Sequence, residues 1–537
     1  MRFTYKKLWK KLIDQNLKKS DLQEMTGLSS RSIAKLGRDE NVSMDSLLKI
    51  CMVLNCGLSE IVDMEEDVPQ DKTSSSEPSL FPLIEEIAPV SSAGVDVKFI
   101  DLFAGIGGIR KGFEIACDKL GLKSSCVFTS EIKPHAVKVL KQNHPDENIY
   151  GDITKVDATQ LPDFDFLLAG FPCQAFSAAG KRLGFQDTRG TLFFDVERIL
   201  KEKQPFGFVL ENVEGLVNHD REKASDPIGR TLSTILEHLD ILGYKVSWRV
   251  LNAKMFGVPQ ERKRIYIVGT KKECPSLENF SHKINPLGTI IEKGLPTENS
   301  AFISQLLKHY PIESLYGKSI KDKRGGANNI HSWDFEYKGP VSARQKELLS
   351  AILTSRRKKI WAEQFGIDWM DGMPLTADQI RTFFDAENLD EMLDDLVEKG
   401  YLVLEHPKKK VSITQDGSDR VAFERIPDNT KPMGYNIVSG KLSFDFTRIL
   451  SPDEVTPTLV AMDMATVGVI DNGGLRHLTL REGLRLFGYP DSYSLDDFSK
   501  TQKGMDWGYD LLGNTVCVPV IESIADRLVQ AYAKEGK

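Results

Sequence analysis

Apolar and polar positions follow two alternating patterns along most of the chain after Val97. Short apolar runs bounded by turn residues, such as VKFIDLF (97–103), predict buried strands. Apolar residues recurring every three or four positions, as in IRKGFEIACDKLG (109–121), predict helices. Further apolar runs occur at 124–132, 163–172 and 206–213. Strands that alternate with helices predict an α/β fold, a Rossmann-like, doubly wound parallel sheet with helices on both faces.

The N-terminal segment has only the helical pattern. Leu8, Leu12 and Ile13 form one apolar stripe, and KSDLQEMTGLSSRSIAKLGRDE predicts a helix, a turn at Gly27 and a second helix. A helix, a glycine turn and a basic helix are typical of a helix-turn-helix domain, and the pattern resembles the Cro/phage-repressor type. A small helical bundle with a solvated basic face is the alternative. The DNA-contacting residues that we expect on the second helix are Arg31, Ser32 and Lys35.

Composition divides the chain into further segments. We expect a small all-α helix-turn-helix domain at residues 1–65 and a Ser- and Pro-rich acidic linker at 66–96. The strand–helix rhythm at 97–275 predicts an α/β domain, and its return at 461–537 predicts the C-terminal part of that domain. Residues 276–460 carry the basic clusters KDKRGG, RRKK and HPKKK and predict a separate, mixed domain. Within it, two helices and a hairpin at about 375–413 predict a winged-helix-like insertion.

Charge and cysteine content limit the function classes. The 537-residue chain has a net charge of −7, which argues against a uniformly cationic nucleic-acid coat. Residues 1–60 nevertheless carry eleven Lys or Arg against seven Asp or Glu, so positive charge is concentrated there. The seven cysteines show no Cys-x-x-Cys pattern, so we expect neither a disulfide framework nor a metal site. No apolar stretch is long enough for a membrane span, and we expect a cytoplasmic protein.

A glycine-rich turn and two acidic residues suggest a cofactor site. The predicted first strand runs into Gly105, Gly107 and Gly108, which leaves bare backbone beside a ligand. The spacing departs from the Gly-x-Gly-x-x-Gly pattern of dinucleotide sites. Glu131 ends the second strand, where an acid suits a ribose diol, and Asp152 is placed to accept from an adenine amine. We therefore expect a cofactor with an adenosine group.

A thiol and a carboxyl occupy the ends of two further predicted strands. Cys173 follows a strand and the turn GFP, and Glu211 ends the strand FGFVLENV. In QERKRIYIVG, Gln260, Arg262 and Arg264 are expected to point the same way at a strand edge. An adenosine-bearing cofactor without hydride chemistry indicates S-adenosylmethionine. A thiol beside that cofactor suits methylation of carbon 5 of cytosine, which becomes nucleophilic only after a thiolate adds to carbon 6. A carboxyl that hydrogen-bonds or protonates N3 assists this addition, and a duplex base must first be flipped out.

The motifs together resemble the DNA (cytosine-5) methyltransferase family. They are DLFAGIGG, GFPCQAFSAAG, ENVEGL, QERKRIYIVG, LTLREGLRLFGYPD and LLGNTVCVPV, in the family's order, and they span most of 97–275 and 450–537. The resemblance implies that 97–275 and 461–537 form the catalytic, S-adenosylmethionine-binding domain and that 276–460 form the target-recognition domain. It implies Cys173 as nucleophile, Glu211 as the N3 partner, and Arg262 and Arg264 as pocket cations. It implies S-adenosylmethionine contacts from Phe103, Ile106, Gly107, Gly108, Glu131, Ile132, Asp152, Ile153, Pro172, Leu192, Asn514 and Val516. It implies DNA contacts from Gln174, Ser177, Lys181, Arg182, Gln260 and Thr458.

These expectations favour a site-specific DNA methyltransferase of a restriction–modification system, with double-stranded DNA as partner. It would act as a monomer on its methylation target, while the N-terminal domain would pair on an operator and regulate transcription. A tRNA cytosine-5 methyltransferase is the first alternative, because relatives share these motifs. A transcription regulator with an incidental catalytic half is the second, and an NAD-linked oxidoreductase is disfavoured by the glycine spacing. The sequence specifies neither the target site nor the operator.

Overall fold

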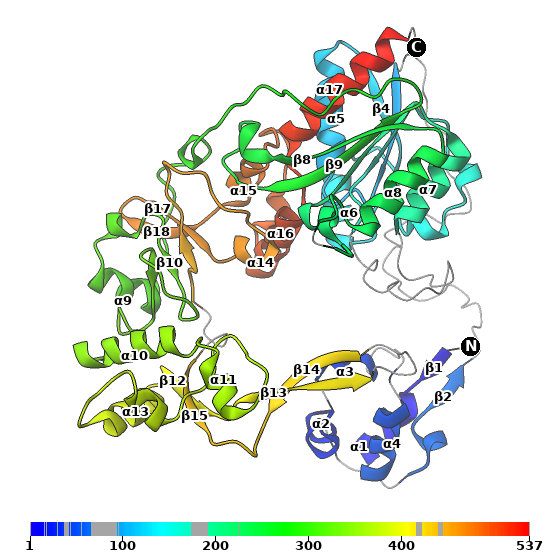
Figure 1. The fold of residues 1–537 in the computed structure, drawn as a ribbon. Coiled ribbons are helices and arrows are strands. Elements are labelled where there is room, and N and C mark those ends of the chain that lie inside the picture. Colours follow the sequence, from blue (N-terminus) through cyan, green and yellow to red (C-terminus); the bar gives the residue numbers. More distant parts are fainter. Residues whose placement is uncertain are drawn as a thin grey trace. The chain divides into compact units, whose positions relative to one another are not determined.

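The computed structural model describes residues 2–14, 17, 19–28, 30–36, 42, 44–54, 56–65, 94, 96–172, 192–223, 225–414, 421–438 and 444–535. The chain divides into two compact units, Met1–Ser79 and Leu80–Lys537. Figure 1 shows the secondary structure of both. Each unit has its own hydrophobic core and is described separately.

The N-terminal unit is a helical bundle whose ends are joined by a short β-ribbon. Its helices are α1 (Lys6–Asp14), α2 (Lys19–Thr26), α3 (Ser30–Leu36) and α4 (Met44–Val53). Gly27 turns the chain between α2 and α3 with a φ of 65°, in the left-handed region that glycine favours. The helix-turn-helix prediction is therefore met in the backbone. The all-helical expectation missed β1 (Arg2–Thr4), which pairs antiparallel with β2 (Asp63–Glu65).

The C-terminal unit contains a seven-stranded sheet of order β5-β4-β3-β6-β7-β9-β8. The strands are β3 (Val97–Leu102), β4 (Ser124–Ser130), β5 (Ile149–Tyr150), β6 (Phe166–Ala169), β7 (Gly207–Val213), β8 (Lys245–Asn252) and β9 (Lys263–Thr270). Strands β5, β4, β3, β6 and β7 are parallel, as predicted. Strand β9 runs antiparallel to both β7 and β8. The sequence analysis missed β8, whose polar and half-buried residues do not form an apolar run.

Helices cover both faces of this large sheet. Helices α5 (Gly108–Lys119) and α17 (Val518–Lys534) lie on one face, and α7 (Leu192–Lys203) and α8 (Arg230–Ile241) lie on the other. Helices α6 (Pro134–Asn143), α14 (Ala461–Met464), α15 (Leu480–Leu486) and α16 (Gln502–Asn514) contribute residues to the same core as α5 and α17. Alternate residues of β6 enter opposite cores: Leu168 packs in the core that contains α5 and α17, whereas Leu167 packs in the core that contains α7 and α8. The doubly wound arrangement predicted from the strand–helix rhythm is confirmed.

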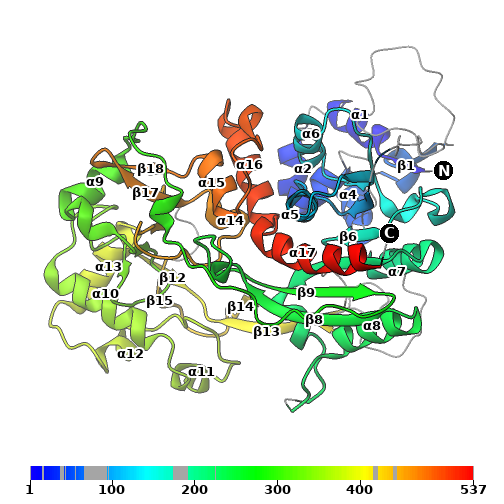
Figure 2. The same cartoon turned by 90° about the horizontal axis from the view of Figure 1, so that it is seen from above.

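The last helix packs against the first helix of the sheet domain. A Cβ on Gly112 of α5 would lie 2.6 Å from the Ile521 Cβ of α17, so only glycine allows this close approach. Lys119 of α5 and Glu522 of α17 form an ion pair at the surface. Figures 1 and 2 show the two helices side by side. This packing brings the segment before α17 to the glycine-rich turn that precedes α5.

A five-stranded sheet of order β11-β10-β16-β17-β18 follows. Its strands are β10 (Ser319–Ile320), β11 (Asn329–Ile330), β16 (Arg448–Ile449), β17 (Val467–Asp471) and β18 (Gly474–His477), and α9 (Ala301–His309) covers it. Phe302 of α9, Phe335 and Phe446 form its aromatic core. Strands on both sides of residue 460, where the sequence predicted a domain boundary, belong to this one sheet.

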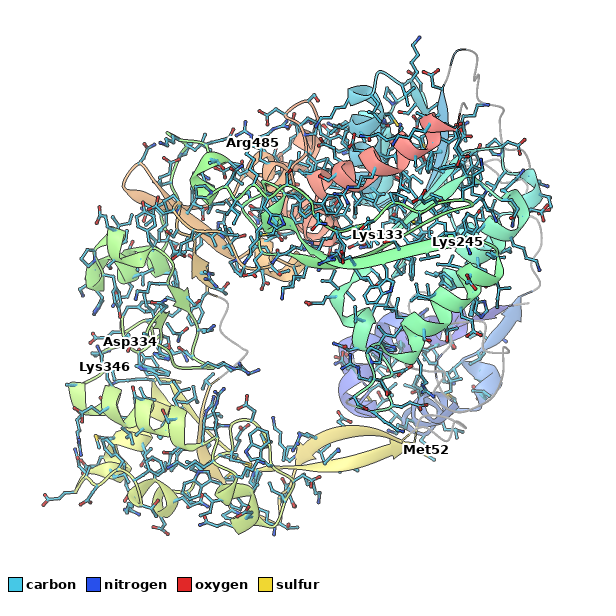
Figure 3. The ribbon with its side chains drawn as sticks, turned by 45° about the horizontal axis from the view of Figure 1, so that its top comes forward. Met52, Lys133, Lys245, Asp334, Lys346 and Arg485 are labelled. Atoms are coloured by element: carbon cyan, nitrogen blue, oxygen red, sulfur yellow. The ribbon has the colours of Figure 1, made fainter. Side chains whose placement is uncertain are left out.

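Residues 341–438 form a further domain that is inserted in the chain between β11 and β16. Its elements are α10 (Ala343–Ser355), α11 (Ile360–Phe365), α12 (Ala377–Arg381), α13 (Leu389–Glu398), β12 (Leu402–Glu405), β13 (Lys408–Thr414), β14 (Val421–Pro427) and β15 (Gly434–Ile437). Lys346 at the start of α10 donates to the backbone oxygen of Asp334 at 3.2 Å, which anchors the helix to the preceding segment (Figure 3). The domain contains the two helices predicted at 375–413, but no hairpin forms within that range. Strand β12 pairs with β15, and β13 forms its hairpin with β14, beyond residue 413.

Among the residues that the structure describes, no helix combines the length and the apolar composition that a membrane crossing requires. Within the same residues, no group of three or more His, Cys, Asp or Glu side chains is arranged to hold a metal ion.

Candidate active site

The glycine-rich turn after β3 adopts left-handed backbone conformations at three positions. Phe103, Gly105 and Gly107 have φ values of 54°, 56° and 71°, and α5 begins at Gly108. A Cβ on Gly105 would meet nothing within 4 Å, so the backbone there borders open space. The turn therefore presents bare main chain at the carboxyl end of the parallel strands, where α/β proteins bind ligands.

Glu131, directly after β4, is held by backbone N–H groups. Its Oε2 accepts from Gly105 at 2.7 Å, and its Oε1 accepts from Ile132 at 2.8 Å and from Lys133 at 2.7 Å. These bonds fix the carboxylate and join the second strand end to the glycine turn. Each carboxylate oxygen keeps acceptor capacity for a ligand hydroxyl.

Two further predicted cofactor residues lie near this strand end. Ile132 is 63% exposed although it is apolar, which leaves a flat surface for a ring system beside Glu131. Asp152 is half-buried and uses Oδ1 to accept from the Thr154 backbone at 3.1 Å and its hydroxyl at 2.8 Å. The adjacent Ile153 is buried and anchors this short segment in the core.

The segment between α16 and α17 reaches the glycine turn. A Cβ on Gly108 would lie 2.8 Å from the Val516 side chain and 2.9 Å from the Thr515 hydroxyl, so these residues pack directly on the start of α5. The hydroxyls of Tyr489 and Thr515 bond each other at 2.6 Å. Asn514 is exposed, and its amide donates to the backbone oxygen of Asp510 at 2.7 Å. The structure thus brings Val516 and the glycine turn together.

A buried acid lies below the turn. Asp101 of β3 is 1% exposed, and neither of its carboxyl oxygens has a hydrogen-bond partner among the described residues. Burial raises the pKa of Asp101 to about 8, and Arg110 opposes that shift. The side chain is therefore mostly protonated at neutral pH. Asp101 is the first residue of the motif DLFAGIGG, whose pattern predicted no role for it.

Glu211 of β7 and Arg264 of β9 form an ion pair at the neighbouring strand ends. Glu211 is buried, and its Oε1 lies 3.2 Å from the Arg264 Nε. Burial raises the pKa of Glu211, while the positive charges of Arg264 and then Arg262 lower it. The net shift is upward, which favours a carboxyl group that carries a proton or shares one. Glu211 can therefore donate a hydrogen bond to a ring nitrogen.

The strand end before Cys173 lies beside Glu211. A Cβ on Gly170 would be 3.7 Å from the Glu211 Oε2, and the Asn212 amide donates to the Phe171 backbone oxygen at 2.9 Å. Asn212 therefore ties the chain that leads to Cys173 to the strand that carries Glu211. The described part of this segment ends at the exposed Pro172 and resumes at the half-buried Leu192. The predicted site residues Cys173, Gln174, Ser177, Lys181 and Arg182 lie outside the described residues.

Arg262 and Arg264 occupy different environments. Arg264 belongs to β9, whereas Arg262 precedes the strand and is buried. The Arg262 guanidinium donates to the backbone oxygens of Leu459 at 3.2 Å, Gly513 at 3.1 Å and Thr515 at 2.9 Å, and it stacks over the ring of Phe487. The positive charges of both cations nevertheless act on Glu211, and the expectation that they point the same way at the strand edge stays a prediction. The base-side role of Arg262 stays a prediction.

An open cleft of about 640 Å³ lies between β9 and the segment before α14. Described residues that line it include Glu261, Lys263, Arg264 and Thr458. Thr458 is exposed, and its hydroxyl donates to the Glu261 backbone oxygen at 2.6 Å. Gln260 is fully buried and does not belong to this lining; its Oε1 accepts from the Leu459 backbone at 3.4 Å. In this structure Gln260 positions the segment that carries Thr458.

The predicted DNA-contacting residues of the N-terminal unit lie on α3. Ser32 and Lys35 are half-buried on this helix, and Arg31 occupies its second position. The opposite side of α3 enters the core through Ile33 and Leu36. The helix can therefore present its polar face, as the second helix of a helix-turn-helix does.

The site fits an adenosine-bearing cofactor. The open backbone at Gly105, the fixed carboxylate of Glu131 and the exposed side chain of Ile132 lie along one edge of the sheet. The sequence reasoning did not recognise the positioning residues Asn212, Tyr489 and Thr515. Asn212 follows Glu211 in the motif ENVEGL. Its hydrogen bond to Phe171 depends on the pairing of two strands far apart in sequence, so the motif alone does not predict it.

The fold and this site define an α/β enzyme of the Rossmann-like methyltransferase class. Residues 97–530 match the sequence model of the C-5 cytosine-specific DNA methylase family, and residues 7–67 match that of the Cro/C1-type HTH DNA-binding domain. The chain is 61% identical to Type II methyltransferase M.NlaIV of Neisseria lactamica, over 81% of this chain and 99% of that protein. It is 39% identical to Type II methyltransferase M.BanI of Aneurinibacillus aneurinilyticus, over 82% and 97% of the two chains.

The chain therefore belongs to the C-5 cytosine-specific DNA methylase family and is a DNA cytosine-5 methyltransferase with an N-terminal helix-turn-helix domain. The family resemblance carried by the sequence motifs is confirmed.

Proposed function

We propose that this enzyme methylates carbon 5 of one cytosine within a specific duplex sequence and serves as the modification enzyme of a Type II restriction–modification system. The relatives that support this role carry the name Type II methyltransferase and align over nearly their whole length. The observation that carries the chemistry is the pair of Glu211 and Arg264 beside the chain that leads to Cys173. Modification of the target would protect host DNA from a cognate restriction enzyme.

The proposed reaction begins when the Cys173 thiolate adds to carbon 6 of the flipped-out cytosine. Glu211 hydrogen-bonds or protonates N3, so the electron pair displaced from the ring is stabilised and carbon 5 becomes nucleophilic. The Arg264 guanidinium holds the Glu211 carboxyl in place. Carbon 5 then gains the methyl group, loses its proton to a base, and expels the thiolate from carbon 6. The Cys173 thiolate and the Glu211 acid thereby return to their initial states, and the methyl group has replaced the proton on carbon 5.

S-adenosylmethionine supplies the electrophilic methyl group when it is bound. We assign its adenosine part to the edge formed by Glu131, Ile132 and Asp152, and its remainder to the glycine turn near Phe103 and Gly105. Val516 and Leu192 would complete the walls of the site. The carboxylate of Glu131 suits a ribose diol, because it is already oriented by three backbone N–H groups.

Covalent trapping tests the thiolate step directly. A duplex that carries 5-fluorocytosine at the target cannot lose a proton from carbon 5, so the enzyme stays bonded to it after methyl transfer. We expect the wild-type chain to form a complex that survives denaturing electrophoresis and that the Cys173→Ala variant does not form. A Cys517→Ala variant is the matched control, because that thiol is buried, and it should still form the complex. Trapping by Cys173→Ala would contradict the assignment.

We further propose that the N-terminal unit binds an operator and regulates transcription of its own gene or of a linked nuclease gene. The support is the helix-turn-helix backbone and the basic residues on α3. Footprinting of the full chain on the upstream DNA tests this role. Protection should persist in Cys173→Ala and disappear in an Arg31→Ala/Lys35→Ala variant that still methylates DNA. Equal protection by both variants, or none by the wild type, would refute it.

A further inference from the structure

The domain at residues 341–438 has the topology of a winged helix. After α10, an isolated bridge of Leu375 with Tyr435 starts a small sheet, which is completed by the antiparallel pair β12 and β15. Helices α12 and α13 lie between the bridge and β12, and the β13–β14 hairpin lies between β12 and β15. The core is continuous through Leu349, Leu393 and Ile437. In a helix-turn-helix of the usual kind, α13 would be the helix that enters the major groove.

Helix α13 has the wrong charge for that position. Its buried stripe contains Leu389, Met392, Leu393 and Leu396. Its remaining face carries five acids, namely Asp390, Glu391, Asp394, Asp395 and Glu398. Lys399, which follows the helix, is paired with Asp395 at 2.7 Å. A duplex carries one negative charge per roughly 1.7 Å of its axis, so this face repels it.

A group of cations from the domain and from the loop that precedes it lies on another surface. Three segments contribute to it: the loop after β10, the corner between α10 and α11, and the hairpin. We call this surface the basic wing face, and it consists of Lys323, Arg324, Arg357, Lys358, Lys410 and Arg425.

Side-chain contacts join the first two segments. Arg357 donates to the Lys323 backbone oxygen at 3.3 Å. Both Arg357 and Arg324 reach Asp371, at 3.1 Å and 3.8 Å. Asp371 offsets part of this charge, but Lys323, Arg324 and Lys358 are exposed and add to it. The two segments therefore form one positive surface.

The hairpin joins the same surface through the loop at 366–372. Arg425 of β14 donates to the Trp369 backbone oxygen at 2.8 Å, and the Trp369 indole donates to the Arg357 backbone oxygen at 3.1 Å. Lys410 lies directly opposite Arg425 in the hairpin register, so their side chains are on the same face. The hairpin projects away from the helices of its domain (Figures 1 and 3).

We propose that this domain binds the phosphate backbone of duplex DNA through the basic wing face, while α13 is turned away from the DNA. The inference rests on the proposed function for the presence of a duplex substrate, but not on the chemistry of the active site. The occupant is duplex DNA beside the methylated sequence, recognised by charge and without a base code. Exposed lysines and arginines on a rigid corner and a projecting hairpin suit contacts to phosphates, which position a protein on DNA.

The test compares two variants of the full chain with the wild type. Lys323→Ala/Lys358→Ala/Lys410→Ala removes three side chains from the basic wing face. Lys201→Ala/Lys245→Ala/Lys272→Ala removes three exposed lysines of the large-sheet domain as a matched control. The dissociation constant for a duplex with the methylated sequence and long flanks is measured over a range of salt concentrations, together with kcat at saturating DNA.

We expect the basic-face variant to bind the duplex more weakly, by roughly tenfold or more at physiological salt, with kcat unchanged. The slope of log K against log salt should become shallower by about 2 to 3, because each lost phosphate contact contributes about 0.9. The control variant should keep the wild-type slope. An unchanged slope in the basic-face variant, or an equal loss in the control, would overturn the proposal. Failure of the wild type to methylate DNA would refute the proposed function instead, because binding is measured separately.

Discussion

At the scale of single residues, the site depends on carboxyl groups whose proton affinity is set by burial. Glu211 of β7 and Asp101 of β3 lie in one sheet, where β6 separates the two strands, and burial raises the pKa of both side chains. Glu211 has a cation beside it and faces the chain that leads to Cys173, so its proton can serve chemistry. Asp101 has no hydrogen-bond partner among the described residues, so its raised pKa reflects the free-energy cost of burying a charged carboxylate.

Replacement of Glu211 by Gln should separate proton supply from shape. Gln keeps the size of the side chain but cannot protonate N3, so we expect kcat to fall by about 10²-fold or more. Glu211 must carry a proton to act as an acid, so the wild-type rate should fall as pH rises through its raised pKa. Rates of labelled methyl transfer as a function of pH check both effects. A Glu211→Gln variant with the wild-type rate would contradict this role.

Asp101 should make the folded state less stable as pH rises. Its pKa is about 8 when folded against 3.8 as the reference value, so the folded state binds the extra proton across that interval. Its stabilising contribution is complete below pH 3.8 and is lost as pH approaches about 8. As pH rises, the free energy of unfolding of the wild type should therefore fall relative to that of the Asp101→Asn variant, by at most about 1.4 kcal/mol per pH unit. Denaturant titrations at several pH values measure it, and a pH-independent difference would contradict the assignment.

At the scale of elements, Arg262 connects segments that are far apart in the sequence. Its guanidinium binds carbonyl groups at Leu459, Gly513 and Thr515, which places the segment before α17 beside the glycine turn. A cation with three backbone acceptors is therefore a positioning group in this structure. Arg264, which pairs with Glu211, has the more direct link to the chemistry.

Arg262→Met should mainly lower the free energy of unfolding, whereas Arg264→Met should mainly lower kcat. Loss of the Arg262 guanidinium leaves buried carbonyl groups unpaired, at a cost of about 2 to 4 kcal/mol in the free energy of unfolding. Arg264→Met should lower the free energy of unfolding less and kcat more, because it frees Glu211. Thermal denaturation and steady-state kinetics on both variants provide the comparison. If Arg264→Met were the less stable protein and Arg262→Met the less active, the two roles would have to be exchanged.

The elements also show how far the sequence could predict the structure. Apolar runs identified β3, β4, β6 and β7, and the glycine turn and Glu131 came from their order along the chain. Strand β8 was missed because residues such as Lys245 and Arg249 interrupt its apolar pattern. The partners of Asn212 and Arg262 could not be predicted, because their bonds depend on tertiary packing. The burial of Gln260 and Arg262 could not be predicted for the same reason.

At the scale of the whole molecule, charge is distributed unevenly over separately folded parts. The chain has a net charge of −7, yet basic residues gather at α3 and on the basic wing face. Acids gather on α13, where a DNA-reading helix would be positive. Such segregation lets an acidic protein bind a polyanion at chosen surfaces and avoid uniform attraction to it.

The most direct test of the central claim is bisulfite sequencing of plasmid DNA from cells that express the wild-type chain, beside cells that express Cys173→Ala. Methylation at carbon 5 protects cytosine from conversion. We expect protected cytosines within one short recurring sequence in the wild type and none above background in the Cys173→Ala variant. Folded wild-type protein with no protected cytosine anywhere, or the same protection in both samples, would contradict it.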